Sequence, residues 1–95
     1  MNPAMMNKIR KMQKEMMEAQ KRLEESIFTG TAGGGMVKVV LTGNKSAVSV
    51  SIDPSIVDPD DVEMLEDLVL AALNDAGSKA DKLRADKMGR FGGLM

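Results

Sequence analysis

The first 25 residues contain a narrow apolar stripe at helical spacing, and this stripe constrains the fold more than any other feature. Asn2 can cap a helix, and Pro3 suits its first position. The apolar residues that follow recur at alternating intervals of four and three positions, which is a heptad pattern. The pattern predicts a helix from Pro3 to about Glu25, with a length of about 35 Å. Its apolar seam consists of Met5, Ile9, Met12, Met16, Ala19 and Leu23.

A second long helix is predicted in the C-terminal part. Asp58 is expected to cap it, Pro59 to occupy its first position, and Gly89 to end it after about Lys87. Residues 89–95 are then expected to form a flexible tail. The predicted helix is about 43 Å long, although Gly77 interrupts its apolar face. That face consists of Val62, Leu65, Leu68, Val69, Ala72, Leu73, Ala76, Ala80 and Leu83.

Between the helices, alternating apolar residues predict three short strands. They are expected at residues 27–32, 36–42 and 47–52, with turns at Gly33-Gly34-Gly35 and Gly43-Asn44-Lys45. The second strand should bury Val37, Val39 and Leu41, and the third Val48, Val50 and Ile52. The sequence therefore predicts one α+β domain over residues 1–95, with a three-stranded antiparallel β-meander between a long N-terminal helix and a long C-terminal helix.

The lengths of the two helices predict an assembly. A compact domain of 95 residues has a radius of gyration of about 12 Å, so the two helices cannot both lie inside it. The helices must protrude into water or pair with another copy of the chain, and their apolar seams favour pairing. We therefore expect a homodimer.

The composition excludes several classes of function. The chain has no Cys, His, Trp or Tyr and only two Phe. Disulfides, thiolate chemistry and the commonest metal ligand are therefore ruled out, and so are the aromatic platforms that bind single-stranded nucleic acid. No pairing of a base with a nucleophile is visible. We expect no catalytic residue, no metal, no cofactor and no small-molecule substrate.

Two features bear on location. No apolar run approaches the roughly 18 residues of a membrane span. Basic residues from Lys8 to Lys14 occupy the region where a signal peptide would need an apolar stretch. The expectation is a cytoplasmic protein with no membrane partner.

The net charge of −1 conceals a segregation of charge along the chain. Residues 1–22 hold six basic and two acidic residues, whereas residues 53–67 hold seven acidic residues and no basic one. The basic residues of the first segment are Lys8, Arg10, Lys11, Lys14, Lys21 and Arg22, and a second cluster contains Lys79, Lys82, Arg84 and Lys87. Basic ends on protruding helices are suited to contact phosphates.

Each of these helical features has a second interpretation. The basic face could be an ordinary solvated surface, stabilised by ion pairs at i,i+4 such as Lys11–Glu15 and Lys14–Glu18. The methionine-rich seam could be an adaptable groove that captures a partner protein, or a plain helix–helix contact. If the basic ends contact phosphates, the chain is a DNA-binding protein. The alternative is a dimeric adaptor that binds a partner protein through its methionine-rich helices.

Three blocks in order narrow this choice. They are GGGMVKVVLTG at 33–43, SVSIDP at 49–54 and DPDDVEMLEDLVLAALNDA at 58–76. This succession closely resembles the YbaB/EbfC family of bacterial nucleoid-associated proteins, and the likeness covers nearly the whole chain. The resemblance implies a tweezer-like homodimer in the nucleoid that binds double-stranded DNA through basic residues on its projecting helices. Carried over by position, the implied DNA-binding residues are the ten basic residues of the two clusters above.

Overall fold

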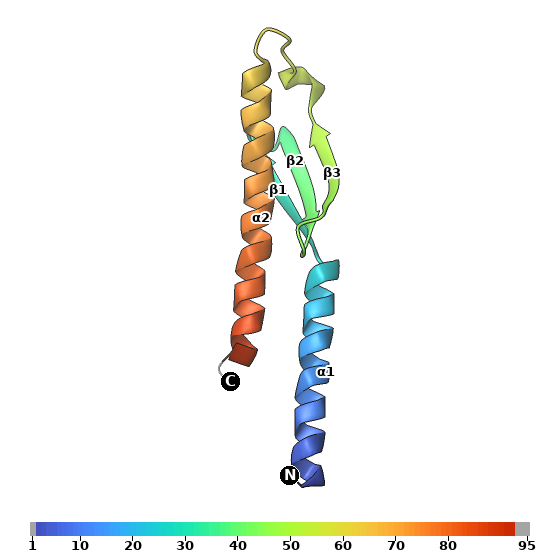
Figure 1. Cartoon of the computed structure of the whole chain (residues 1–95). Coiled ribbons are helices and arrows are strands. Elements are labelled where there is room, and N and C mark those ends of the chain that lie inside the picture. Colours follow the sequence, from blue (N-terminus) through green and yellow to red (C-terminus); the bar gives the residue numbers. More distant parts are fainter. Residues whose placement is uncertain (1, 93–95) are drawn as a thin grey trace.

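The fold has two long helices joined by a small sheet. The computed structural model describes the backbone of residues 2–92 and the side chains of residues 2–86. The elements are α1 Pro3–Glu25, β1 Ile27–Ala32, β2 Val37–Thr42, β3 Ala47–Ile52, the 3-10 helix η1 Pro54–Ile56 and α2 Val62–Gly92. Helix α2 lies along one face of the sheet, whereas α1 continues beyond its end (Figure 1). This architecture confirms the predicted α+β fold.

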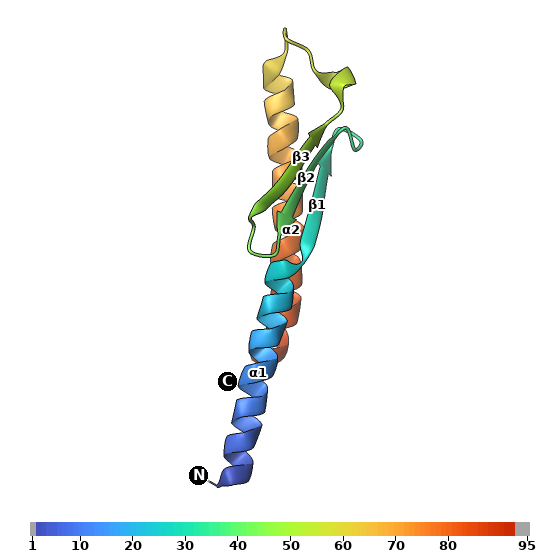
Figure 2. The ribbon, with the colours of Figure 1, turned by 90° about the vertical axis from the view of Figure 1, so that its right-hand side faces the viewer.

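The molecule is elongated, as the view turned by 90° also shows (Figure 2). It measures 71 × 20 × 16 Å, and its radius of gyration is 19.2 Å. A compact domain of this size would have a radius of gyration of about 12 Å. The prediction that the helices protrude is therefore confirmed for α1.

Helix α1 has the bounds that its sequence predicts. The side chain of Asn2 accepts a hydrogen bond from the backbone N–H of Met5 at 2.7 Å, and Pro3 occupies the first turn. At the other end, Ser26 takes an extended conformation and donates from both its N–H and its Oγ to the carbonyl oxygen of Arg22. Local capping therefore fixes both ends of the helix.

The sheet is an antiparallel meander in the order β1-β2-β3. Three glycines with positive φ, Gly33 to Gly35, form the first turn, where a residue with a Cβ would be strained. The central strand buries Val37, Val39 and Leu41 against α2, as predicted. Because α2 also buries Ala72 and Ala76 there, a strand and a helix supply most of the core.

Small residues allow β1 to approach α2 very closely. A Cβ added at Gly30 would overlap the carbonyl oxygen of Ala72 and the backbone nitrogen of Ala76. On the helix, Ala72, Ala76 and Ala80 lie four residues apart and are fully buried. The absence of a side chain at Gly30 and the small side chains of α2 together set the spacing between helix and sheet.

The inner face of β3 is not covered by the described part of the chain, which corrects one prediction. Val50 pairs with the buried Val39, so both side chains point to the same face of the sheet. Val48 and Val50 nevertheless remain 58% and 55% exposed, while Ile52 is half-buried. The reason is geometric, because one helix about 10 Å wide covers two strands that lie about 4.8 Å apart, but not a third.

The predicted bounds of α2 are wrong at both ends. Asp58, Pro59 and Asp60 form a turn in which the Asp58 carboxylate accepts from the N–H of Asp60 at 2.9 Å. Asp61 is the cap, since its carboxylate accepts from the N–H of Met64 at 3.2 Å. At the other end the helix passes through Gly89 and ends at Gly92. The remainder of the predicted tail, residues 93–95, lies outside the described residues.

Candidate nucleic-acid interface

Helix α1 is an arm with little support from the rest of the chain. Leu23, in its last turn, is the only buried residue of this helix. Met16 and Ala19 are half-buried, and the outer seam residues Met5, Ile9 and Met12 are exposed. The seam is therefore covered only where α1 leaves the sheet, and the rest of it faces solvent.

The basic residues of α1 are all exposed. Lys8, Arg10, Lys11, Lys14, Lys21 and Arg22 extend along its length. At 100° per residue, Arg10, Lys14 and Lys21 form a stripe on the side opposite the apolar seam. The stripe extends for about 16 Å along the helix. Its position leaves these three cations on the outer side of the arm.

Ion pairs within α1 do not neutralise this stripe. Among the described side chains, the ion pairs are Lys45–Asp81 and Lys79–Asp75, and neither involves α1. The Arg22 side chain does not reach the Glu18 carboxylate but donates from Nε to the Glu18 carbonyl oxygen at 3.3 Å. The basic surface of the arm is therefore available to an anionic partner.

On α2, Lys79 lies against the sheet. Its Nζ donates to the carbonyl oxygen of Thr29 at 2.9 Å and lies 3.2 Å from an oxygen of the Asp75 carboxylate. Asp75 in turn accepts from the backbone N–H of Thr31 at 3.0 Å. The hydrogen bond from Thr31, helped by Lys79, lowers the pKa of Asp75 below its ordinary value. These contacts attach β1 to α2.

Arg84 and Lys82 lie two residues apart on α2, but only Arg84 contacts the β2–β3 turn. The Arg84 guanidinium donates to the carbonyl oxygen of Gly43 at 2.8 Å, in the turn between β2 and β3. Lys82 is exposed and makes no hydrogen bond or ion pair with a described residue. Lys87 lies in the helical backbone, and its side chain is beyond the described ones. The second cluster is thus divided between cations that contact the sheet and a solvent-facing one.

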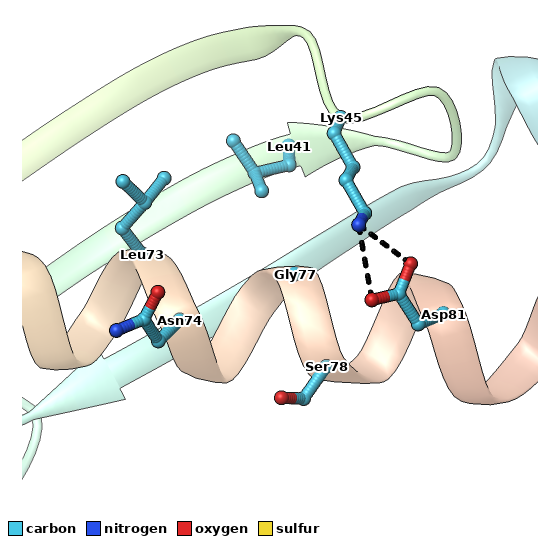
Figure 3. A pocket seen from close by; sticks show the side chains of 7 residues that line it. All are labelled: Leu41, Lys45, Leu73, Asn74, Gly77, Ser78 and Asp81. Atoms are coloured by element: carbon cyan, nitrogen blue, oxygen red, sulfur yellow. Dashed lines mark hydrogen bonds and ion pairs between the residues drawn. The ribbon is translucent and has the colours of Figure 1, made fainter.

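Sequence reasoning missed the contact between the β2–β3 turn and α2. Lys45 has a φ of 65°, and its Nζ lies 2.7 and 3.0 Å from the two carboxylate oxygens of Asp81 (Figure 3). The partners are 36 residues apart, so no local spacing rule could pair them. The only available signal was the turn sequence itself, which places Lys45 beside Gly43 and Asn44.

The acidic residues gather at the opposite end of the molecule from the arm. The segment from Asp53 to Asp67 contains η1, the following turn and the first turns of α2, which lie at the top of Figure 1. Asp53 accepts from the N–H of Ser55 at 2.9 Å, and this backbone contact lowers its pKa. The acids therefore serve local turns and a helix cap, and the charge of the chain is separated along its long axis.

The chain as a whole matches the YbaB/EbfC DNA-binding family over residues 1–95. The chain belongs to this family. Members are non-enzymatic architectural proteins, in agreement with the expectation from composition. A surface of exposed cations on a projecting helix is accordingly a candidate DNA interface in a YbaB/EbfC protein.

Relatives and one solved structure agree with the family assignment. The chain is 60% identical to a nucleoid-associated protein of Exiguobacterium over 81% of this chain and 73% of the relative. A nucleoid-associated protein of Alkaliphilus oremlandii is 50% identical over 96% and 80% of the two chains, respectively. The fold is similar to the crystal structure of an uncharacterized protein from Helicobacter pylori, with 28% identity and a TM-score of 0.72. That likeness covers 100% of this chain and 99% of the other.

The two helices lack the apolar character of membrane-spanning helices. Neither α1 nor α2 is apolar enough over its described length to cross a bilayer.

Proposed function

We propose that this chain is a nucleoid-associated protein of the cytoplasm that binds duplex DNA as a homodimer and contributes to nucleoid organisation and gene regulation. The observation that carries the proposal is the stripe of exposed cations on α1 in a chain of a DNA-binding family. Arg10, Lys14 and Lys21 are the principal phosphate contacts. Of the remaining arm cations, Lys11 and Arg22 lie beside this stripe, and Lys8 lies nearer to the apolar seam.

The homodimer is supported by the open inner face of β3. Beside that strand, a groove of about 420 Å³ runs between β3 and α2. Its lining is almost entirely apolar and consists of Ile52, Leu65, Glu66, Val69, Leu70 and Leu73. Leu70 and Leu73 are 56% and 40% exposed, and the groove continues the core formed by Val37 and Val39.

A second copy of the chain is the occupant that this surface fits best. The uncovered face needs an apolar element of similar length, and β3 with α2 of another copy supplies one. A two-fold axis through this face makes the contact self-complementary, as closed dimers require. Each dimer then carries two α1 arms, which doubles the number of phosphate contacts.

The mechanism of binding is electrostatic. Lysine and arginine side chains that contact phosphates release counterions from the duplex, so affinity falls steeply with salt and depends little on sequence. Neither α1 nor α2 is arranged as a recognition helix of a helix-turn-helix motif. The acidic end of each protomer lies away from the arms and is therefore placed away from the DNA.

A matched pair of charge reversals tests the DNA contact. Lys14→Glu changes an exposed lysine of the arm, and Lys38→Glu makes the same change in charge at an exposed lysine of β2. Each lost phosphate contact lowers the slope of log affinity against log salt by about one, so two arms lose about two. We expect this loss for Lys14→Glu and a much smaller change for Lys38→Glu in mobility-shift assays at several salt concentrations. Equal effects of the two reversals would contradict the proposed interface.

The dimer has its own matched pair. Leu70→Asp places a carboxylate in the proposed contact, whereas Ile27→Asp places one at a site that is 65% exposed on the opposite edge strand. Burying an unpaired charge is costly, so Leu70→Asp should dissociate the dimer at micromolar concentration. Sedimentation equilibrium should report a dimer for the wild type and for Ile27→Asp. A wild-type monomer would refute the self-association, whatever the outcome with DNA.

The exposed seam of α1 favours one other function. If the wild type does not shift DNA at low salt, Met5, Ile9 and Met12 become the functional surface, and the chain is a dimeric protein-interaction adaptor.

A further inference from the structure

Three parts of the chain meet at the turn between β2 and β3. Gly43 is buried there, and a Cβ added to it would overlap the carbonyl group of Leu23 in the last turn of α1. From the other side, the Arg84 guanidinium of α2 donates to the Gly43 carbonyl oxygen at 2.8 Å. The end of the arm, the turn and α2 are thus in direct contact through one residue.

A second contact holds the same turn. Lys45, two residues after Gly43, forms its ion pair with Asp81, which lies almost one helical turn before Arg84 (Figure 3). The turn is further closed by the N–H of Lys45, which donates to the Thr42 carbonyl oxygen at 2.9 Å. The turn is therefore held on α2 by contacts that do not involve α1.

This junction has a large effect on the arm because α1 has so few other contacts. Leu23 is the one buried residue of α1, and the helix extends about 30 Å beyond it toward Pro3. A small rotation at Leu23 consequently moves the outer cations by several ångströms. The contact between Leu23 and Gly43 is therefore one of the few that can set the direction of the arm, beside the contacts of α1 with α2.

From these contacts we propose that Gly43 and Arg84 are positioning residues that fix the direction of the DNA-binding arm. Arg84 acts through the Gly43 carbonyl group and not as a phosphate contact, in contrast to its assignment from the family resemblance. This inference rests on the proposed function, because the arm matters only if its cations bind DNA. It also gives the close backbone contact at Gly43 a role in DNA binding.

The first test changes the geometry without changing the charge. Gly43 has no positive φ, so Gly43→Ala leaves the backbone unstrained and acts through the overlap with Leu23. The variant should lower the salt slope of DNA affinity by about two, the loss of one phosphate contact from each arm, although it removes no cation. Gly77→Ala is the matched control, since a Cβ at Gly77 meets no atom of its own protomer within 4 Å; because Gly77 adjoins Leu73 of the proposed dimer contact, sedimentation equilibrium must show that this variant is still a dimer. A wild-type slope for Gly43→Ala would overturn the proposal.

The second test measures the arm directly and needs no DNA. The chain has no cysteine, so Gln13→Cys on α1 and Ser51→Cys on β3 accept spin labels at two exposed sites. Labelled chains are mixed with an excess of unlabelled chains, so that the measured distance lies within one protomer. Pulsed electron paramagnetic resonance should give a narrow distance distribution for the wild type and a shifted or broader one for Gly43→Ala.

Lys82, two residues before Arg84, is the control that distinguishes a positioning role of Arg84 from the loss of one positive charge. Arg84→Met should broaden the distance distribution, whereas Lys82→Met, which removes the same charge, should leave it narrow. Arg84→Lys should restore the narrow distribution, because one N–H donor is enough for one carbonyl group. If Arg84→Met leaves the distribution narrow and lowers the salt slope as much as Lys82→Met does, Arg84 is a phosphate contact and the proposal fails.

Folding and function are kept apart in these tests. Circular dichroism shows whether each variant retains its helices, and if Gly43→Ala unfolds, Arg84→Met decides the question. If the wild type does not bind DNA, the proposed function fails, and the spin-label distances still determine whether the junction sets the direction of the arm.

Discussion

The close approach of β1 to α2 predicts that one methyl group at Gly30 destabilises the protein severely. A Cβ there overlaps the backbone of α2 at Ala72 and Ala76, and it would lie 2.8 Å from the Ala76 Cβ. These are atoms of a helix backbone, not the end of a flexible side chain, so the sheet and the helix must separate. Overpacking a core costs about 1–3 kcal/mol, and contact with backbone places Gly30→Ala at about 3 kcal/mol or above.

This cost is large compared with the stability of the chain. A domain of 95 residues has a free energy of unfolding of roughly 5–14 kcal/mol. For a domain of this size, 1 kcal/mol shifts Tm by about 4–8 °C, so Gly30→Ala should lower Tm by about 12 °C or more. Gly77→Ala adds the same methyl group to helix α2 where it meets no atom of its own protomer within 4 Å, and it should raise the free energy of unfolding by about 1 kcal/mol if the dimer is retained.

Thermal unfolding followed by circular dichroism measures both variants. All samples need the same protein concentration, because the Tm of a dimer depends on it. We expect opposite shifts for the two glycines. A Tm for Gly30→Ala within about 4 °C of the wild type would show that the helix and sheet are not packed as tightly as described.

Two further predictions concern carboxylates. Asp61→Ala should lower the free energy of unfolding by about 1 kcal/mol because it removes the cap of α2, and Asp58→Ala should lower it less. Chemical denaturation tests this order, and the reverse order would restore Asp58 as the cap. The lowered pKa of Asp75 means that its charged form stabilises the folded state above the ordinary value of 3.8 and that this contribution is lost as the pH falls through the lower folded value. Stability should therefore fall as the pH is lowered below 3.8, and the fall should be shallower for Asp75→Asn, as urea denaturation at a series of pH values would show.

Local signals predicted most of the elements. Asn2 and Pro3 define the start of α1, and the alternation of Val37, Val39 and Leu41 identifies the inner face of β2. These residues act on their immediate neighbours, so spacing alone was sufficient. The start of α2 was misplaced because residues 58 to 61 contain three carboxylates, of which Asp58 and Asp61 each accept a hydrogen bond from a backbone N–H. Only the three-dimensional path of the chain selects Asp61.

The candidate site was predicted less completely. Exposure on one face of α1 follows from helical periodicity, and the structure agrees for Arg10 and Lys14. Lys79 and Arg84 looked equivalent to Lys82 in the sequence, but they contact carbonyl groups 50 and 41 residues away. Long-range contacts of this kind depend on how the sheet packs on α2, which the spacing of charges does not encode.

The scarcity of contacts along α1 has a consequence for its local stability. Helix formation begins with a costly nucleus, and most helical stability in proteins comes from packing, of which the outer turns of α1 have little. The amide protons of the outer turns, from about Ala4 to Met12, should therefore exchange with solvent much faster than those around Ala76. DNA that contacts Arg10 and Lys14 holds these turns in the helical state and slows their exchange. Part of the binding free energy is then used to order the arm, so substitutions that raise helix propensity on its solvent side should tighten DNA binding without adding a contact.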